Sequence, residues 1–507
     1  MAAIMLTVTM VVLFVAFLLG GIFFVWKIYQ KRADIWLPAY LRSCLFPARN
    51  SRNKVKSKLT HVFFLFVDHF EPGNGGADAK EMQRRCDAWM LGYPKMAQKF
   101  TDADGKHPQH TWFYPPHYDV NYLQQISGLC YDGFGEIEMH LHHENDTSES
   151  LRVKLEDCKR LYRQFGALIT AEKNPRQVYG FIHGMWALDN SADGKHCGVN
   201  NELQVLNATG CYADFTLPSG YKTQTRKINS IYYAIDDHDR PKSHDTGIDL
   251  EAGKFTEGDL LIVQGPLGIN WKSRPFPKIE NASITRRNSP TPDRIDYWVK
   301  CGIGVKGRPN WIFIKVHTHG AVPRDWDSIF GDAAEKMHAY LGRKYNDGSQ
   351  YKLHYVTARE AYNIIKAVEA GEQGEDPNQY RDYLIPPYAN TRIQISHPYK
   401  LLSYTPDGIV VQINHDGINR IKMHGFLLKS CEGNVQYFSY REEPKSGNIV
   451  IIVEGDGKTI WTLGRDVKLI EGQNADLISK YQYNGDTLIS RVINRGVNFR
   501  IELSVQP

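Results

Sequence analysis

The chain has little net charge for its length. Its 61 Lys and Arg residues nearly balance 56 Asp and Glu residues, which leaves a formal charge of +5 over 507 residues. Apart from one cluster near the amino terminus, the basic residues are spread along the sequence, whereas a nucleic-acid-binding protein concentrates them on one surface. This balance argues against nucleic acid as a partner.

Cysteine is also scarce. The eight cysteines show neither CxxC spacing nor the regular spacing of a disulfide framework. Scattered cysteines fit free thiols in a reducing compartment, although an even number leaves disulfides open. There is no internal repeat or low-complexity tract, and 42% hydrophobic with 23% charged residues is typical of a globular protein. A chain of this length is too long for one ordinary core.

Charge is missing altogether from residues 4–26. At about 1.5 Å per residue, a helix of this length crosses a bilayer of roughly 30 Å. A cleaved signal peptide would have a shorter apolar centre with a small-residue cleavage site, and a buried core helix would have a polar face. We therefore expect an uncleaved transmembrane anchor.

Basic residues gather on one side of this run. The first five residues carry no charged side chain, whereas nine Lys and Arg residues lie within positions 27–58. The positive-inside rule then places the large domain on the cytoplasmic side, in a single-pass protein of a bacterial inner membrane. Residues 27–58 lack an amphipathic period, so we interpret them as a basic juxtamembrane linker, with binding to anionic headgroups as the alternative.

Apolar runs alternate with helical patterns through residues 60–390. Strand-like runs that each precede a helical pattern lie at residues 62–67, 136–141, 178–182, 312–316 and 353–356. This alternation predicts an α/β barrel, with an open doubly wound parallel sheet as the alternative. Residues 396–507 instead show alternating strands separated by turn residues, which predicts an all-β, sandwich-like domain.

Polar residues follow the most apolar strand. The run VFFLFV at residues 62–67 is followed directly by Asp68 and His69, with Glu71 two residues further on. In α/β proteins the strand fixes the backbone and the following loop exposes the side chain, so strand ends carry the chemistry. A turn aspartate would explain Asp68 alone, but not its neighbours.

Two other strand ends carry histidines. His140 and His142 share one face of an extended segment, about 7 Å apart, while His143 points elsewhere. Two imidazoles on one face can bind one cation, and three histidines within four residues favour a metal site over structural histidines. His317 and His319 follow the strand at 312–316, where an imidazole suits a general acid.

In their order along the chain, these strand-end motifs resemble those of the metal-dependent polysaccharide deacetylases. Members of that family are carbohydrate esterases with a distorted (β/α)7 barrel. Residues 136–142 (EIEMHLH) are similar to an EIxLHLHP motif of divergent members, and residues 180–190 (GFIHGMWALDN) and 210–216 to the motifs that follow it. The resemblance covers roughly residues 60–370. It implies a (β/α)7-type barrel, to which the sandwich-like domain is appended.

The resemblance also implies roles. Asp68 would be the base that activates a water on a divalent metal, zinc above all, and His317 would protonate the leaving amine. His69, in place of the family's second aspartate, would bind the metal with His140 and His142. The chain departs from the family pattern at His69, in the narrow spacing of the other two histidines, and in the arginine missing from residues 181–184.

Some positions keep alternatives. Glu71 competes with His69 as a ligand, because carboxylate and imidazole both suit zinc. His183 is the alternative to the missing arginine. The remaining side chains expected to bind a sugar ring or its hydroxyls are Trp186, Asp189, Asn190 and Trp271, with core packing as the alternative for the tryptophans.

The expected function is that of a membrane-anchored hydrolase that removes N- or O-acetyl groups from a glycan or a lipid-linked saccharide. A lipid-linked precursor on the cytoplasmic leaflet reconciles this substrate with the orientation of the anchor. The alternatives are a non-catalytic glycan-binding scaffold built on the same barrel and a glycosidase.

Overall fold

The computed structural model describes residues 59–390 apart from 164, together with residues 32–45, a few single positions before these and the strands between residues 399 and 505. The predicted membrane run at residues 4–26 lies almost entirely outside the described residues. Among the helices that are described, none combines the length and the hydropathy needed to cross a bilayer.

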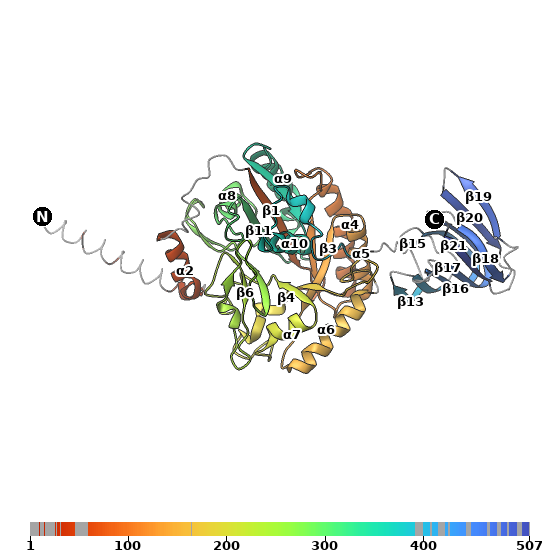
Figure 1. Cartoon of the computed structure of the whole chain (residues 1–507), viewed down its shortest axis with the longest axis horizontal. Coiled ribbons are helices and arrows are strands. Elements are labelled where there is room, and N and C mark those ends of the chain that lie inside the picture. Colours follow the sequence, from red (N-terminus) through yellow and green to blue (C-terminus); the bar gives the residue numbers. More distant parts are fainter. Residues whose placement is uncertain are drawn as a thin grey trace.

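A mostly parallel sheet forms the centre of the α/β body (Figure 1). Its main strands are β1 (Thr60–His69), β2 (His110–Tyr114), β3 (Gly135–Leu141), β4 (Tyr179–His183), β5 (Cys211–Asp214), β8 (Leu260–Gln264) and β11 (Trp311–Thr318). They pair in parallel in the order β11-β1-β2-β3-β4-β5-β8. Val263 of β8 and Phe313 of β11 line one small cavity, so the two ends of the ladder meet and the sheet is barrel-like.

Shorter strands extend this sheet. β12 (Tyr351–Val356) runs parallel to the first half of β1. β6 (Ser230–Ala234) and β7 (Ile248–Asp249) add an antiparallel edge to β8. A separate two-stranded hairpin consists of β9 (Gly268–Asn270) and β10 (Lys278–Glu280).

The strands are buried on both faces, which explains the unbroken apolar run of β1. Phe63, Leu65 and Val67 lie in an inner core shared with β4, β5, β8 and β11. Phe64 and Phe66 lie in an outer core beneath the helices. This alternation decides which side chains at a strand end point into the barrel mouth and which point behind the sheet.

Helices cover the outer face (Figure 1). They are α4 (Ala79–Ala97), α5 (Val120–Tyr131), α6 (Ser148–Arg163), α7 (Glu202–Ala208), α8 (Pro292–Lys300) and α9 (Asp332–Tyr345). α10 (Ala358–Glu369) differs, because its buried side chains belong to the inner core and it contacts both β1 and β4. It therefore closes one end of the barrel interior.

The five strand-helix pairs expected from the sequence are present as β1-α4, β3-α6, β4-α7, β11-α9 and β12-α10. The expected helix ends are also present, since Gly210 and Gly371 have φ of 98° and 86° directly after α7 and α10. The sequence patterns did not identify β2, α5, β8 and α8. β2 and β8 have five residues each and α8 has nine, which is short for recognising a period.

Part of the expected juxtamembrane linker is a helix, α2 (Ala33–Leu45). Ala33, Trp36 and Tyr40 are buried and pack with Leu267 of the barrel. The hydroxyl of Tyr40 donates a hydrogen bond to the carbonyl of Ile269 at 3.2 Å. Within the expected basic linker, this stretch is therefore packed on the barrel, and its stripe of three buried positions is too short to have shown as an amphipathic period.

The carboxyl-terminal region is all-β, as expected. Its strands are β13 (Tyr399–Thr405), β14 (Gly408–Ile413), β15 (Ile421–Met423), β16 (Phe426–Glu442), β17 (Ile449–Leu463), β18 (Val467–Gln473), β19 (Ile478–Tyr483), β20 (Asp486–Ile493) and β21 (Phe499–Val505). All of them pair antiparallel within one nine-stranded sheet. A division into two packed sheets stays a prediction.

Candidate metal centre

Three metal-binding side chains converge at the end of the barrel. His140 lies on β3, His142 follows that strand, and Glu71 lies two residues beyond β1. One donor atom from each residue lies within 4.8 Å of the others. Parallel strands end at the same edge of a sheet, which is why residues about 70 positions apart in sequence meet here. These three residues form what we name the mouth group.

Distances within the mouth group match a tetrahedral metal site. The Nε2 atoms of His140 and His142 are 3.1 Å apart. Oε1 of Glu71 lies 2.8 Å from Nε2 of His142 and 3.6 Å from Nε2 of His140. Ligands at about 2.0–2.2 Å from a tetrahedral zinc ion lie roughly 3.3 Å from one another. The residues therefore fit a divalent metal and leave a fourth coordination position open.

Hydrogen bonds prepare these atoms as ligands. Nδ1 of His140 donates to the carbonyl of Ile182 at 2.8 Å, which leaves a lone pair on Nε2. Asn74 donates to Oε2 of Glu71 at 3.1 Å. Burial raises the pKa of Glu71, but the neighbouring imidazoles, with Nε2 of His142 2.8 Å from Oε1, outweigh burial and hold this pKa well below its usual range. Glu71 is therefore a carboxylate when a cation arrives.

His69, predicted as a ligand, lies beside the mouth group. Its ring stacks on that of His319, with centroids 4.7 Å apart, and meets the ring of His140 edge-on at 4.9 Å. Burial and the neighbouring histidines lower the pKa of His69 well below its usual value, so it is neutral. The structure thus places Glu71, the alternative ligand, together with His140 and His142. The ring of His69 packs against the ring of His140.

The two histidines after β11 lie at different depths. Nε2 of His319 lies 3.7 Å from Oε2 of Glu71, and its side chain is 29% exposed. His317, predicted as the acid, is buried and lies two residues before His319, deeper in the barrel. There burial and the charge of Lys315 lower the pKa of His317 to about 3. His317 is therefore neutral near pH 7 and buried, whereas His319 is partly exposed and faces the mouth group.

Asp68 points to the other side of β1. Its side chain is fully buried, and its Oδ1 accepts a hydrogen bond from the backbone N–H of Gly320 at 2.6 Å. Its Oδ2 lies 3.0 Å from Nε2 of His110. Because side chains alternate along a strand, Asp68 and His69 face opposite ways. Asp68 thus holds the turn after His319 and has no open path to the mouth group.

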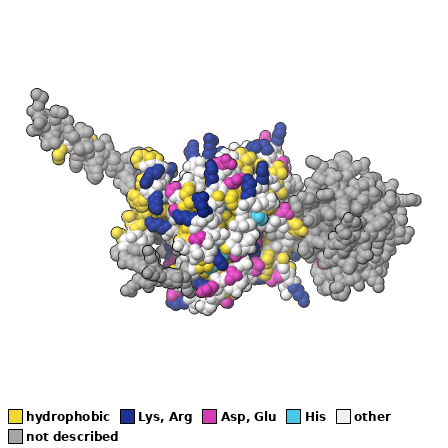
Figure 2. All heavy atoms as spheres, turned by 90° about the horizontal axis from the view of Figure 1, so that it is seen from above, with side chains coloured by type: hydrophobic (Ala, Val, Ile, Leu, Met, Phe, Trp, Pro, Cys, Tyr) yellow, Lys and Arg dark blue, Asp and Glu magenta, His cyan; other side chains and the backbone are white. Residues whose placement is uncertain are grey.

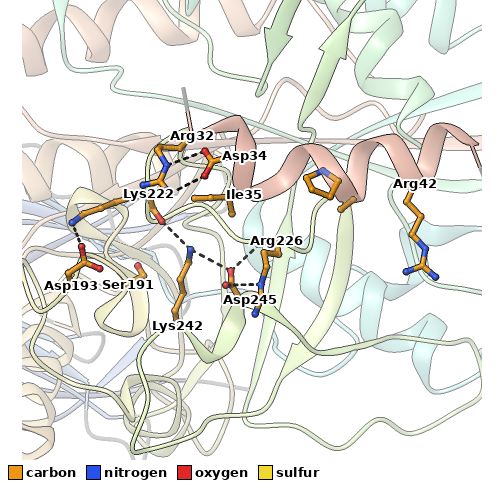
Figure 3. Close-up of a pocket in the computed structure, with 12 residues that line it drawn as sticks. Arg32, Asp34, Ile35, Arg42, Ser191, Asp193, Lys222, Arg226, Lys242 and Asp245 are labelled. Carbon is orange, nitrogen blue, oxygen red and sulfur yellow. Dashed lines mark hydrogen bonds and ion pairs between the residues drawn. The ribbon is translucent and has the colours of Figure 1, made fainter. Parts of the chain in front are cut away.

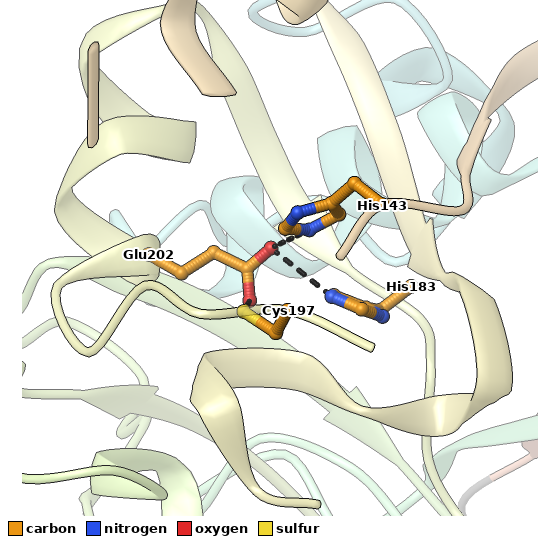
Figure 4. A group of neighbouring side chains, drawn as sticks. All are labelled: His143, His183, Cys197 and Glu202. Atoms are coloured by element: carbon orange, nitrogen blue, oxygen red, sulfur yellow. Dashed lines mark hydrogen bonds and ion pairs between the residues drawn. The ribbon is translucent and has the colours of Figure 1, made fainter. Parts of the chain in front are cut away.

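His183 belongs to a different group, behind the sheet. It lies with His143, Cys197 and Glu202, whose donor atoms are all within 4.8 Å of one another (Figure 4). His143 follows β3 but points away from His140 and His142, as its position in the sequence predicted. We name these four residues the rear group. His183 is therefore not placed to orient Asp68.

Among the predicted sugar-binding residues, Trp186 alone contacts the surroundings of the mouth group. Its ring lies 5.6 Å from that of His69 and 5.3 Å from that of Tyr221, which is 57% exposed. Asp189 is buried and accepts from the N–H of Ser243, and Asn190 bonds Asn200. Trp271 is 64% exposed and donates to Tyr40 on α2.

A cavity beside α2 has a volume of about 760 Å³ (Figure 3). Its twelve lining residues include five Lys and Arg but no histidine or cysteine. Arg32 pairs with Asp34, Lys222 with Asp193, and Arg226 with Asp245. Figure 2 likewise shows basic and acidic side chains interspersed on the face it presents. We therefore place the chemistry at the mouth group and not in this cavity.

Comparisons with known proteins leave the family open. No protein-family model matches the chain, and no curated protein matches it. Among solved structures, a candidate glycoside hydrolase/deacetylase from Parabacteroides distasonis is similar at 8% identity, with 79% of this chain and 85% of that chain covered and a TM-score of 0.33. A TM-score this low carries no argument about function.

Proposed function

We propose that the chain is a metal-dependent hydrolase that removes an acetyl group from a glycan, on a barrel of the polysaccharide-deacetylase type. The observation that carries the proposal is the tetrahedral spacing of Glu71, His140 and His142, with one coordination position open. A glycan substrate rests on the motif resemblance and on the aromatic rings beside this position.

Glu71, His140 and His142 would hold the metal. One carboxylate and two imidazoles suit zinc. A divalent metal in such a site polarises a carbonyl group and lowers the pKa of water. The 33% exposure of the His142 side chain indicates the side from which substrate enters.

His319 is the side chain best placed to move a proton. It lies next to Glu71 and is open to solvent, and imidazole exchanges protons near neutral pH. Its backbone is held firmly, since Trp89 and Trp326 donate to the carbonyl of Gly320 at 2.9 Å and 3.0 Å. We assign proton transfer to His319 in place of His317, and a positioning role to Asp68.

Trp186 and Tyr221 would contact the sugar. Their tilted rings provide an apolar surface next to His69 and His319, and sugar rings pack against such faces. Trp271, on the hairpin beside α2, would contact a more distant part of a long glycan.

The membrane assignment is part of the proposal. Residues 4–26 would anchor the chain in a bacterial inner membrane, with the α/β body on the cytoplasmic side. α2 follows this run closely and packs on the barrel through Trp36 and Tyr40. This packing would hold the barrel close to the bilayer, where a lipid-linked saccharide is presented. Protease accessibility of the α/β body in intact cells tests the orientation.

A non-catalytic scaffold is the second candidate function. It is favoured by the position of Asp68, which bonds Gly320 and lies beside His110 away from the mouth group. Within the described part of the chain, Glu71 is then the carboxylate of the mouth group, and the metal would occupy it. The same fold would then bind glycan without hydrolysing it.

The test combines metal content and acetate release. Full-length protein is purified, its zinc is measured by elemental mass spectrometry, and acetate is measured after incubation with acetylated chitooligosaccharides. We expect metal in the mouth group and acetate release that needs it. Metal without acetate release from acetylated sugars supports the scaffold, and release of reducing ends in place of acetate supports a glycosidase.

A further inference from the structure

The rear group lies on the outer side of the sheet, outside the proposed active site. His143 follows β3, His183 ends β4, and Glu202 begins α7. Cys197 lies in the loop between β4 and α7. All four side chains are buried, and Figure 4 shows them pointing toward one centre. Nothing in the proposed hydrolysis uses them.

Nε2 of His183 and Oε1 of Glu202 face each other with no hydrogen atom between them. Nδ1 of His183 donates to the carbonyl of Gly184 at 2.6 Å, so its Nε2 carries a lone pair. This buried Nε2 has no hydrogen-bond partner and lies 3.4 Å from Oε1 of Glu202. A lone pair that faces a carboxylate in a buried place is unfavourable unless a cation lies between them.

His143 is prepared in the same way, and Cys197 adds a sulfur whose S–H donates to Glu202. Nδ1 of His143 lies 2.9 Å from Oδ2 of Asp146, which leaves Nε2 directed at Glu202 at 3.1 Å. Such a carboxylate behind a histidine is the usual support for a metal ligand. Sγ of Cys197 lies 3.5 Å from Oε2 of Glu202 and accepts the N–H of Val199 at 3.4 Å. That N–H would stabilise a thiolate.

We propose that His143, His183, Cys197 and Glu202 bind a structural zinc ion. Two imidazoles, one thiolate and one carboxylate complete a tetrahedral shell, and the thiolate and carboxylate together balance the charge of Zn²⁺. Oε1 of Glu202 lies 3.1 Å from Nε2 of His143 and 3.4 Å from Nε2 of His183, and its Oε2 lies 3.5 Å from Sγ of Cys197. These separations are close to the edges of such a shell, roughly 3.3–3.6 Å. With four protein ligands and no solvent access, this site is closed to substrate.

The rear zinc would fix the loop that serves the mouth group. Between β4 and α7 the backbone has positive φ at Met185, Trp186, Asp189 and Asn190, conformations that need support from their surroundings. Trp186 belongs to this loop and lies against His69. A metal bound to both ends of the loop would hold that ring in place.

Cobalt substitution tests the proposal without measuring activity. Full-length protein is loaded with Co²⁺, and thiolate-to-cobalt charge transfer is recorded in the near ultraviolet. The mouth group contains no sulfur, so the band reports the rear group alone. We expect the band in the wild type and in His140→Ala/His142→Ala, and its loss in Cys197→Ser. Cys158→Ser, at a buried cysteine of α6 outside both groups, is the matched control and keeps the band.

A wild-type protein without the band, or a band that persists in Cys197→Ser, would overturn the proposal. If Cys197→Ser does not fold, the wild-type spectrum and its zinc content still decide, because two zinc ions are expected per chain and one in His140→Ala/His142→Ala. The outcome is independent of the proposed hydrolysis. A band without acetate release would overturn only the proposed hydrolase activity. Acetate release without a band would overturn only the proposed zinc site in the rear group.

Discussion

The mouth group and the rear group both contain a histidine from the end of β3, but they differ in exposure and in the number of donors. His142 and His143 are adjacent in sequence, yet alternation sends them to opposite faces of the sheet. The mouth group has three donors, and the side chain of His142 is 33% exposed. In the rear group the side chains of His143 and Glu202 are 0% exposed, and four donors close the shell. In the proposed assignment, the face of the strand thus decides between an open, reactive site and a closed, structural one.

The largest expected effect comes from removing the mouth group. His140→Ala/His142→Ala should lose one metal equivalent and lower acetate release by about a thousandfold, since Lewis-acid catalysis contributes several kcal/mol. Elemental analysis and acetate release measure the two losses. The control is His117→Ala, an exposed histidine whose ring centroid is 6.0 Å from that of His142. An unchanged rate in the double variant would remove the mouth group from the mechanism.

His319→Gln should be the next most damaging change. Loss of general acid-base catalysis typically costs about 10²- to 10⁴-fold in kcat, and metal content should stay the same. Burial lowers the pKa of His319, so in the wild type its neutral, proton-accepting form persists below pH 6.5. Activity should therefore fall only as the pH drops below the ordinary imidazole range. His317→Gln is the comparison, and a larger loss there would return the proton-transfer role to His317.

Gly184→Ala tests whether the two groups can be separated. A Cβ at this position would lie 2.5 Å from Cγ of His142, so the His142 ring must move. We expect about 10- to 100-fold weaker metal binding at the mouth group, while the cobalt-thiolate band of the rear group remains. Loss of both metals would mean that the groups act as one unit. Gly342→Ala, on α9 with no atom near its Cβ, should gain up to about 1 kcal/mol and change neither site.

The smallest effect on catalysis is expected from Asp68→Asn. The amide oxygen can still accept from Gly320, so a positioning role predicts a loss of about tenfold in kcat, unchanged metal content and about 1–3 kcal/mol lower stability. A general base in the same place predicts a loss of about 10²- to 10⁴-fold together with a changed acid limb of the pH profile. The pH profile of kcat for this variant therefore discriminates the two roles.

The comparison also shows what the sequence could predict. Alternation along β3 correctly separated His143 from His140 and His142. The same rule applied to β1 would have placed Asp68 and His69 on opposite faces, which separates the expected base from the expected ligand. His317 and His319 have the same parity, so only the depth of each in the barrel distinguishes them, and that depth depends on packing.

The rear group could not be assembled from sequence. Cys197 and Glu202 lie in a loop and at a helix start more than 50 residues beyond His143, and neither has a neighbour with metal-ligand spacing. Their meeting depends on how α7 packs behind β4. Likewise, α2 is held by Ala33, Trp36 and Tyr40, which pack against Leu267 of the barrel. Three buried positions are too few to show as an amphipathic period in the sequence.

Anomalous diffraction at the zinc edge, from crystals of the full-length protein, would locate both metals. We expect two peaks, one between Glu71, His140 and His142 and one between His143, His183, Cys197 and Glu202. The first should have an open coordination position and the second a closed tetrahedral shell. Absence of a peak between Glu71, His140 and His142 in zinc-supplemented crystals would show that the mouth group binds no zinc and would overturn the proposed metal-dependent hydrolysis.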